Sequence, residues 1–259
     1  MIGIFDSGIG GLTVAKEIKK ANPNCPIVYF GDSARYPWGD KSSDVIRGYA
    51  VEITEFLISR GARDIVIACN TASTFAADFL RKKYPKINFY DVIDPVVARV
   101  EKERSLKRKL KIGVIGTRGT IGSGVYAKKI KALDKVMKVY SRACPLFVPL
   151  VEEGLLSGKV TKLVVEKYLK DLKKKRLNML VLGCTHYPLL KRMIEGYLGK
   201  DVQIISSAQE IAQGTKKIFS GKGKKVQQDV YYFSDLVEHY QKNIFQILGQ
   251  KVIIKKQVF

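Results

Sequence analysis

The sequence is short of the residue types that build metal and redox sites. Its 259 residues contain 4 cysteines and 2 histidines. No two of the cysteines have Cys-x-x-Cys spacing, which disfavours a structural zinc site and a thioredoxin-like redox pair. Disulfide bonds are disfavoured in a reducing cytosol. We therefore expect neither a metal centre nor a disulfide framework.

Long apolar runs are also missing. No stretch of about 18 residues is continuously apolar, so we expect no segment that spans a membrane. Met1 leads directly into the strand-like stretch IGIF, without the basic and then apolar leader of a secreted protein. We expect a cytoplasmic protein with no membrane partner.

Acidic residues are scarce relative to basic ones. The chain has 24 Asp and Glu against 46 Lys and Arg, a formal net charge of +22. Such a charge is compatible with nucleic-acid binding. The basic residues, however, are spread along expected helices and loops, as in KDLKKKR at residues 170–176. We expect a solvated basic surface with no specific nucleic-acid partner, which can also attract an anionic substrate.

What the chain does contain is a regular alternation of short and long apolar patterns. Longer amphipathic patterns, such as the helical face of Ile46, Ala50, Ile53 and Leu57, lie between short apolar runs. This alternation predicts an α/β fold with mainly parallel sheets flanked by helices, and such sheets bind ligands at the carboxyl ends of their strands. The short runs predict strands at Ile2–Phe5, Ile27–Phe30, Ile65–Ala68, Phe89–Ile93, Ile112–Ile115, Val139–Ser141, Met179–Gly183, Val202–Ile205, Val230–Phe233 and Val252–Ile254.

Two motifs occur twice and in the same order. IGIFDSGIGGLTVAKEI, from Ile2, resembles IGVIGTRGTIGSGVYAKKI, from Ile112. Further along each half, VIACNTAS at residues 66–73 resembles VLGCTHYP at residues 181–188. Units of strand and helix all look somewhat alike, but the matched order favours two related α/β domains. The charged segment at residues 100–111 is a candidate boundary between them, and the last fifty residues could complete either domain.

The glycine-rich loop Asp6–Gly11, DSGIGG, follows a strand and opens a helix. Glycines let the backbone approach a ligand closely, and the amides at a helix N-terminus favour anions. The spacing is neither that of a dinucleotide site nor that of a phosphate loop. The pattern therefore indicates a smaller anion, such as a carboxylate.

Cys69 and Cys184 each lie where a strand ends and a helix is expected to begin. There the helix dipole can lower the thiol pKa from about 8.5, so that the thiol serves as a general base and, once protonated, as a general acid. His186 could share the proton of Cys184. A single such cysteine could be a small buried residue, but a matched pair favours function. If two similar domains face each other, one thiol can remove a proton from a stereocentre while the other delivers one to its opposite face.

Five separated blocks together resemble bacterial glutamate racemases over residues 2–207: IFDSGIGGL, ACNTAS, GVIGTRGTIGS, CPLFVPLVEEG and LGCTHYPLL. The resemblance implies interconversion of L- and D-glutamate without a cofactor, supplying D-glutamate for peptidoglycan. It also implies an active site in the cleft between two similar domains, residues 1–93 with 208–259 and residues 94–207. A homodimer is expected.

The resemblance assigns roles to individual positions. Cys69 and Cys184 form the catalytic pair, with Asp6 assisting Cys69, and with Glu152 and His186 assisting Cys184. The adjacent Glu153 is disfavoured by the block match alone. The implied substrate-binding residues are Asp6, Ser7, Pro37, Trp38, Gly39, Asn70, Thr71, Thr117, Thr120, Thr185 and His186.

Two points and several alternatives stay open. Trp38 stands where the family has Tyr, which puts any contact through the hydroxyl in doubt. Asp32 fits either a structural turn or a group that supports the cleft. An aspartate or hydantoin racemase would use the same two thiols. A cysteine hydrolase would use one thiol as nucleophile with His186 as base, and would leave the second cysteine unexplained.

Overall fold

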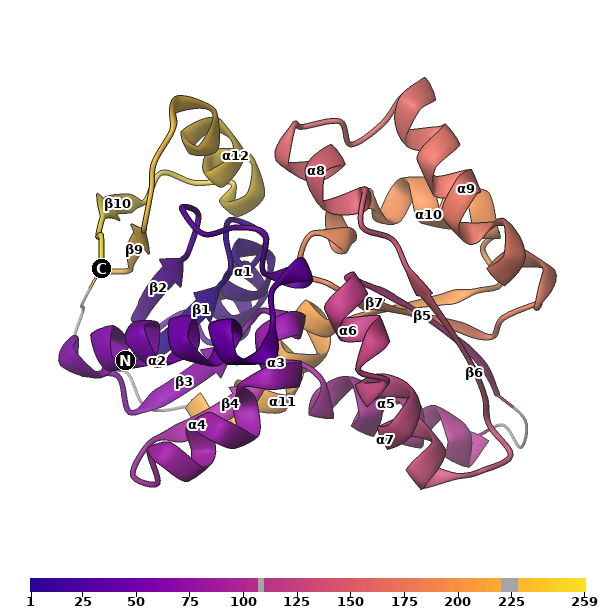
Figure 1. The fold of residues 1–259 in the computed structure, drawn as a ribbon, viewed down its shortest axis with the longest axis horizontal. Coiled ribbons are helices and arrows are strands. Elements are labelled where there is room, and N and C mark those ends of the chain that lie inside the picture. Colours follow the sequence, from indigo (N-terminus) through magenta and orange to yellow (C-terminus); the bar gives the residue numbers. More distant parts are fainter. Residues whose placement is uncertain (107–109, 220–227) are drawn as a thin grey trace.

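The alternating pattern folds into parallel strands joined by helices, arranged in two lobes (Figure 1). This computed structural model describes residues 1–106, 110–219 and 228–259. All the predicted strands form, with small shifts at their ends. In these ranges the strands are β1 (Ile2–Asp6), β2 (Ile27–Gly31), β3 (Asp64–Ile67), β4 (Asn88–Asp91), β5 (Lys111–Gly116), β6 (Lys138–Ala143), β7 (Met179–Gly183), β8 (Gln203–Ser206), β9 (Val230–Phe233) and β10 (Ile253–Lys256).

Helices follow most of the strands, as the pattern predicts. The α-helices are α1 (Leu12–Ala21), α2 (Ser43–Ser59), α3 (Asn70–Phe75), α4 (Ala77–Lys83), α5 (Asp94–Leu106), α6 (Arg118–Gly122), α7 (Val125–Leu133), α8 (Phe147–Glu152), α9 (Lys159–Lys174), α10 (Lys191–Leu198), α11 (Ser207–Phe219) and α12 (Glu238–Leu248). Short 3-10 turns form η1 (Trp38–Asp40) and η2 (Tyr187–Leu190).

The strands form two sheets with the same central order. The first sheet runs β10-β9-β2-β1-β3-β4 and the second runs β6-β5-β7-β8. Every pairing is parallel. The order β2-β1-β3-β4 is therefore repeated as β6-β5-β7-β8, so that β1 corresponds to β5 and β3 to β7. This confirms two similar α/β domains, and β9 and β10 extend the first sheet.

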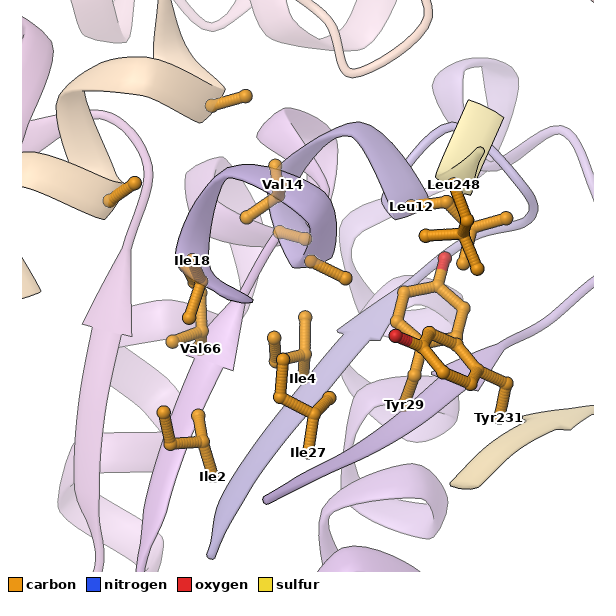
Figure 2. Packing of buried hydrophobic residues seen from close by; sticks show 14 of the residues in the cluster. Ile2, Ile4, Leu12, Val14, Ile18, Ile27, Tyr29, Val66, Tyr231 and Leu248 are labelled. Carbon is orange, nitrogen blue, oxygen red and sulfur yellow. The ribbon is translucent and has the colours of Figure 1, made fainter. Parts of the chain in front are cut away.

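Helices bury their apolar faces on both sides of the sheets. On one side of the first sheet, α1 packs Leu12, Val14 and Ile18 over strand residues such as Ile4 and Val66 (Figure 2). On the other side, α2 buries its predicted face of Ile46, Ala50, Ile53 and Leu57. Each such aliphatic side chain contributes about 1.5–3 kcal/mol when it is fully buried. The rigid sheets place the ends of their strands in fixed positions.

Packing also supports the predicted division of the chain. In α5, Val96 and Val100 join the core of the second sheet. In α11, Ala208 and Ile211 join the core of the first sheet instead. The chain therefore crosses between the two cores near the starts of these helices, while the boundaries at residues 93/94 and 207/208 stay predictions. Of the charged segment at residues 100–111, the first part lies in α5, and residues 107–109 lie outside the described residues.

In the described part of the chain, no helix is long and apolar enough to cross a membrane.

Candidate active site

The carboxyl ends of corresponding strands meet at one pocket. Cys69 follows β3 and Cys184 follows β7, in equivalent places of the two sheets. The pocket has a volume of about 550 Å³, part of it open to solvent. It is lined by Ser7, Tyr36, Pro37, Trp38, Gly39, Asp40, Cys69, Asn70, Thr71, Thr117, Arg118, Pro145, Val148, Pro149, Cys184, Thr185 and His186.

Cys69 caps the N-terminus of α3. Its Sγ accepts a hydrogen bond from Ala72 N at 3.4 Å and donates one to the Oγ of Ser7 at 3.7 Å. Burial, and to a lesser extent the nearby carboxylate of Asp6, raise the pKa of the Cys69 thiol to about 12. The predicted lowering of this pKa by the helix dipole is therefore wrong for Cys69: desolvation outweighs the amides of a six-residue helix.

Asp6 is fully buried at the end of β1. It accepts hydrogen bonds from Gly8 N at 3.1 Å and from Thr185 Oγ1 of the other domain at 3.3 Å. Burial raises the pKa of Asp6 to about 6, although His186 and the hydrogen bonds to the carboxylate act in the opposite direction. Asp6 thus joins the glycine loop to the second domain, and its pKa lies in the range where a carboxyl group can exchange protons near neutrality.

Cys184 has different neighbours. Its Sγ lies 3.8 Å from the Nδ1 of His186, and the Nε2 of His186 lies 2.6 Å from the Oε1 of Glu152. Burial lowers the pKa of His186, but the hydrogen bonds and charges of Cys184 and Glu152 outweigh it and hold this pKa well above its usual value. Glu152 is buried and Glu153 is exposed, so the structure selects the first of the adjacent pair as the partner of His186. The helix expected after Cys184 begins as the 3-10 turn η2, before α10.

The glycine loop approaches the second domain closely because it has no side chain there. A Cβ atom on Gly10 would lie 2.3 Å from His186 Nδ1 and 2.6 Å from Thr185 Oγ1. The Oγ1 of Thr13, at the start of α1, donates a hydrogen bond to the carbonyl of Thr185 at 2.9 Å. The glycine loop therefore packs directly against Thr185 and His186, the two residues that follow Cys184.

Trp38 makes a buried polar contact in the loop that lines the pocket. Trp38 is 1% exposed, and its Nε1 donates a hydrogen bond to Asp32 at 3.1 Å. The same buried carboxylate accepts bonds from Arg35 Nε and Ser234 Oγ, each at 2.8 Å. Asp32 therefore anchors the loop around η1, here called the cleft loop, and does not itself line the pocket.

Threonines join the two domains beside the thiols. Thr71 Oγ1 lies 3.0 Å from Thr117 Oγ1 and 3.4 Å from Thr120 Oγ1. Tyr126 of the second domain donates a hydrogen bond to the Oδ1 of Asn70 at 2.6 Å. These hydroxyls and the Asn70 amide are suited to bind a carboxylate when a substrate displaces some of the contacts.

Most of the sequence-predicted site residues line the pocket, and the remaining three support those that do. These three do not line the pocket but contact residues that do. Asp6 is hydrogen-bonded to Thr185, Glu152 to His186, and Thr120 to Thr117. Sequence reasoning missed six lining residues, Tyr36, Asp40, Arg118, Pro145, Val148 and Pro149. Asp40 and Arg118 directly follow Gly39 and Thr117, so adjacency in the chain was the available signal.

No metal-binding arrangement accompanies these groups. Within the described ranges, no group of three or more His, Cys, Asp and Glu side chains could hold a metal ion. That the chemistry needs no cofactor stays a prediction.

Comparisons with known proteins agree with this geometry. A family model described as Asp/Glu/Hydantoin racemase matches residues 13–215. Glutamate racemase of Aquifex aeolicus is 45% identical over 251 residues, which are 97% of this chain and 95% of that protein. Among solved structures, a glutamate racemase isoform from Bacillus anthracis has a TM-score of 0.92 at 36% identity, covering 99% of this chain and 97% of that one. Glutamate racemase from Francisella tularensis, in complex with D-glutamate, has a TM-score of 0.89 at 35% identity, covering 100% and 96%. The chain therefore belongs to the Asp/Glu/hydantoin racemase family, within its glutamate racemase group.

Proposed function

We propose that this protein interconverts L- and D-glutamate with Cys69 and Cys184 as the two acid–base groups. The observation that carries the proposal is the pair of thiols, which come from corresponding strand ends of two like sheets and line one pocket. Racemisation needs a proton acceptor on one face of the α-carbon and a proton donor on the other. A single-thiol hydrolase would leave one of the two matched cysteines without a role.

In the proposed reaction, one thiolate takes the α-proton and becomes a thiol. The electron pair of the broken C–H bond stays on the α-carbon, and the opposite thiol protonates that carbon from the other face and becomes a thiolate. Cys69 removes the proton of D-glutamate and Cys184 that of L-glutamate, as the family resemblance implies. Reversing the roles reverses the reaction.

The neighbours of each thiol supply different proton reservoirs. With a pKa raised to about 12, Cys69 favours the neutral thiol at neutral pH. To act as a base it needs a nearby positive charge, which the ammonium group of glutamate would bring, and Asp6 can take up its proton. His186, held protonated by Glu152, can exchange a proton with Cys184.

Incubation of the pure protein with L-glutamate in heavy water, without added cofactor, tests the reaction class. We expect D-glutamate that carries deuterium at the α-carbon, and no turnover by the double variant Cys69→Ser/Cys184→Ser. L-Aspartate in a parallel reaction addresses the aspartate alternative, and we expect it to react far more slowly. Absence of both D-glutamate and deuterium incorporation in the parental protein contradicts the proposal.

We also propose that the protein is cytoplasmic, that it supplies D-glutamate for peptidoglycan, and that it forms a homodimer. The dimer is supported by large apolar side chains that the second domain exposes around α8 and α9, including Leu155, Val160 and Leu163. Light scattering of the purified protein tests it, and a mass of 29.1 kDa at micromolar concentration would identify a monomer. Rescue of a D-glutamate-requiring bacterium tests the cellular role.

A further inference from the structure

An ion pair bridges the two domains at the mouth of the pocket. Arg118 begins α6, directly after Thr117, and Asp40 ends η1, directly after Gly39. The Nη1 of Arg118 lies 3.2 Å from each carboxylate oxygen of Asp40. Both residues line the pocket, and their side chains are 64% and 52% exposed. Neither residue was singled out by its sequence pattern.

Beside this pair the domains are in tight contact. A Cβ atom on Gly39 would lie 2.8 Å from the Cβ of Thr117, and one on Gly119 would lie 3.0 Å from the carbonyl oxygen of Gly39. The Thr71–Thr117 contact of 3.0 Å lies beside them. Together these contacts form a seam between the two domains. A substrate that enters from this side must therefore separate Asp40 from Arg118.

The charges favour such an exchange. Among the residues that line the pocket, the basic groups are Arg118 and His186, and His186 is engaged by Glu152. Glutamate carries two carboxylates, and a guanidinium binds a carboxylate through two parallel hydrogen bonds. An exposed pair such as Arg118–Asp40 contributes little to stability, so an incoming carboxylate can compete with Asp40 for Arg118.

We propose that Arg118 is a substrate-binding residue, which leaves Asp40 and takes one carboxylate of glutamate as the substrate enters. Before the substrate enters, Asp40 keeps the guanidinium at the pocket mouth. The inference deepens the proposed function and rests on glutamate being the substrate.

Steady-state racemisation of glutamate by Arg118→Ala tests the proposal, with Arg142→Ala as the matched control. Arg142 forms an exposed pair with Asp171 at 3.4 Å and does not line the pocket, so its removal changes the net charge equally. For Arg118→Ala we expect KM to rise about tenfold, the effect of losing one charge-assisted hydrogen bond, with kcat within about twofold of the parent. Arg142→Ala should keep the parental KM. Added NaCl should lower kcat/KM less steeply for Arg118→Ala than for the parent or for Arg142→Ala.

Two further variants keep the test decisive if Arg118→Ala folds poorly. Arg118→Lys retains the charge but not the bidentate geometry and should show a smaller rise in KM. Asp40→Asn frees the guanidinium and should lower KM by about twofold. The proposal is overturned if Arg118→Ala matches Arg142→Ala in KM and salt dependence, or if Arg118→Lys and Asp40→Asn both keep the parental KM. Failure of the parental protein to racemise glutamate would instead refute the proposed function, before any variant is compared.

Discussion

At the scale of single residues, the two thiols occupy corresponding places with different chemistry around them. Cys69 is hydrogen-bonded to Ser7 and to the amide of Ala72, whereas Cys184 lies beside His186, whose pKa is raised by Cys184 itself and by the buried carboxylate of Glu152. The strand ends repeat, but the groups that supply or accept protons do not. The two directions of the reaction are therefore expected to respond differently to substitutions.

Removal of one thiol should leave the other able to take a proton from one enantiomer. With a glutamate that carries a halogen at the β-carbon, proton removal alone leads to elimination of halide and needs no second thiol. Cys69→Ser and Cys184→Ser should therefore eliminate from opposite enantiomers while both lose racemisation, because a serine hydroxyl is a far weaker acid than a thiol. Release of halide from each enantiomer measures this. If both variants process the same enantiomer, the two-sided mechanism is wrong.

The buried carboxyl of Asp6 should leave a signature in the pH dependence of stability. Its pKa is raised from 3.8 to about 6, mainly by burial. A raised folded-state pKa favours the protonated form, so its contribution to stability is complete below about pH 4 and is lost as pH rises through about 6. Relative to the parent, Asp6→Asn should therefore gain about 3 kcal/mol in free energy of unfolding across that window and change little above it.

Denaturant unfolding at a series of pH values measures the difference between Asp6→Asn and the parent. Asp44→Asn, which removes an exposed carboxylate from the first turn of α2, is the control for the loss of one negative charge. A difference that stays flat from about pH 4 to about pH 7 would show that Asp6 does not titrate there.

At the scale of elements, the cleft loop around η1 is held by side chains behind it. The indole of Trp38 lies over the pocket and is tied to Asp32, which in turn bonds Arg35 and Ser234 at the end of β9. The carboxyl end of β9 thus helps to fix a loop that the family resemblance places near the substrate. The indole N–H of Trp38 has a buried acceptor in Asp32.

Trp38→Phe removes this N–H and keeps an aromatic ring. We expect the free energy of unfolding to fall by about 1–2 kcal/mol and KM for glutamate to rise several-fold, because the loop loses its anchor. Ser234→Ala removes another donor to the same carboxylate without changing the loop, so it should lower stability similarly and leave KM near the parental value. Equal KM values for the two variants would argue against an anchoring role for Trp38.

Secondary structure and the two cysteine turns could be predicted because they depend on local patterns, whereas most other residues that line the pocket came from the family resemblance. Each short apolar run became a strand, and both cysteine turns lie at strand ends. The pKa of Cys69 could not be predicted, since it depends on how deeply the folded chain buries the thiol and on its closeness to Asp6. Arg118 and Asp40 were missed because they form an ion pair only when two distant segments of the chain meet across the cleft. The choice of Glu152 over Glu153 likewise needed the position of His186.

At the scale of the whole molecule, the active site exists only where the two lobes touch. Figure 1 shows the two lobes. Each sheet supplies one thiol to the pocket, and η1 contacts α6 where residues of both line it. Charge has a different distribution: the net +22 is carried across the whole chain, while the pocket lining itself has few charged groups. Recognition of an anion therefore depends more on how the two domains meet around the pocket than on the total charge of the chain.

A methyl group at Gly39 should separate the lobes without harming either one. In Gly39→Ala the added Cβ would lie 2.8 Å from the Cβ of Thr117, while the backbone at position 39 has no left-handed φ that would strain an alanine. We expect the seam to open, kcat/KM to fall by about tenfold to a hundredfold, and the free energy of unfolding to change by less than about 1 kcal/mol. Gly48→Ala is the control, since nothing lies within 4 Å of its added Cβ inside α2. It should gain about 0.5–1 kcal/mol of stability and keep parental kcat/KM. Small-angle scattering and steady-state kinetics on both variants measure the effect, and a fully active Gly39→Ala would show that catalysis tolerates an open seam.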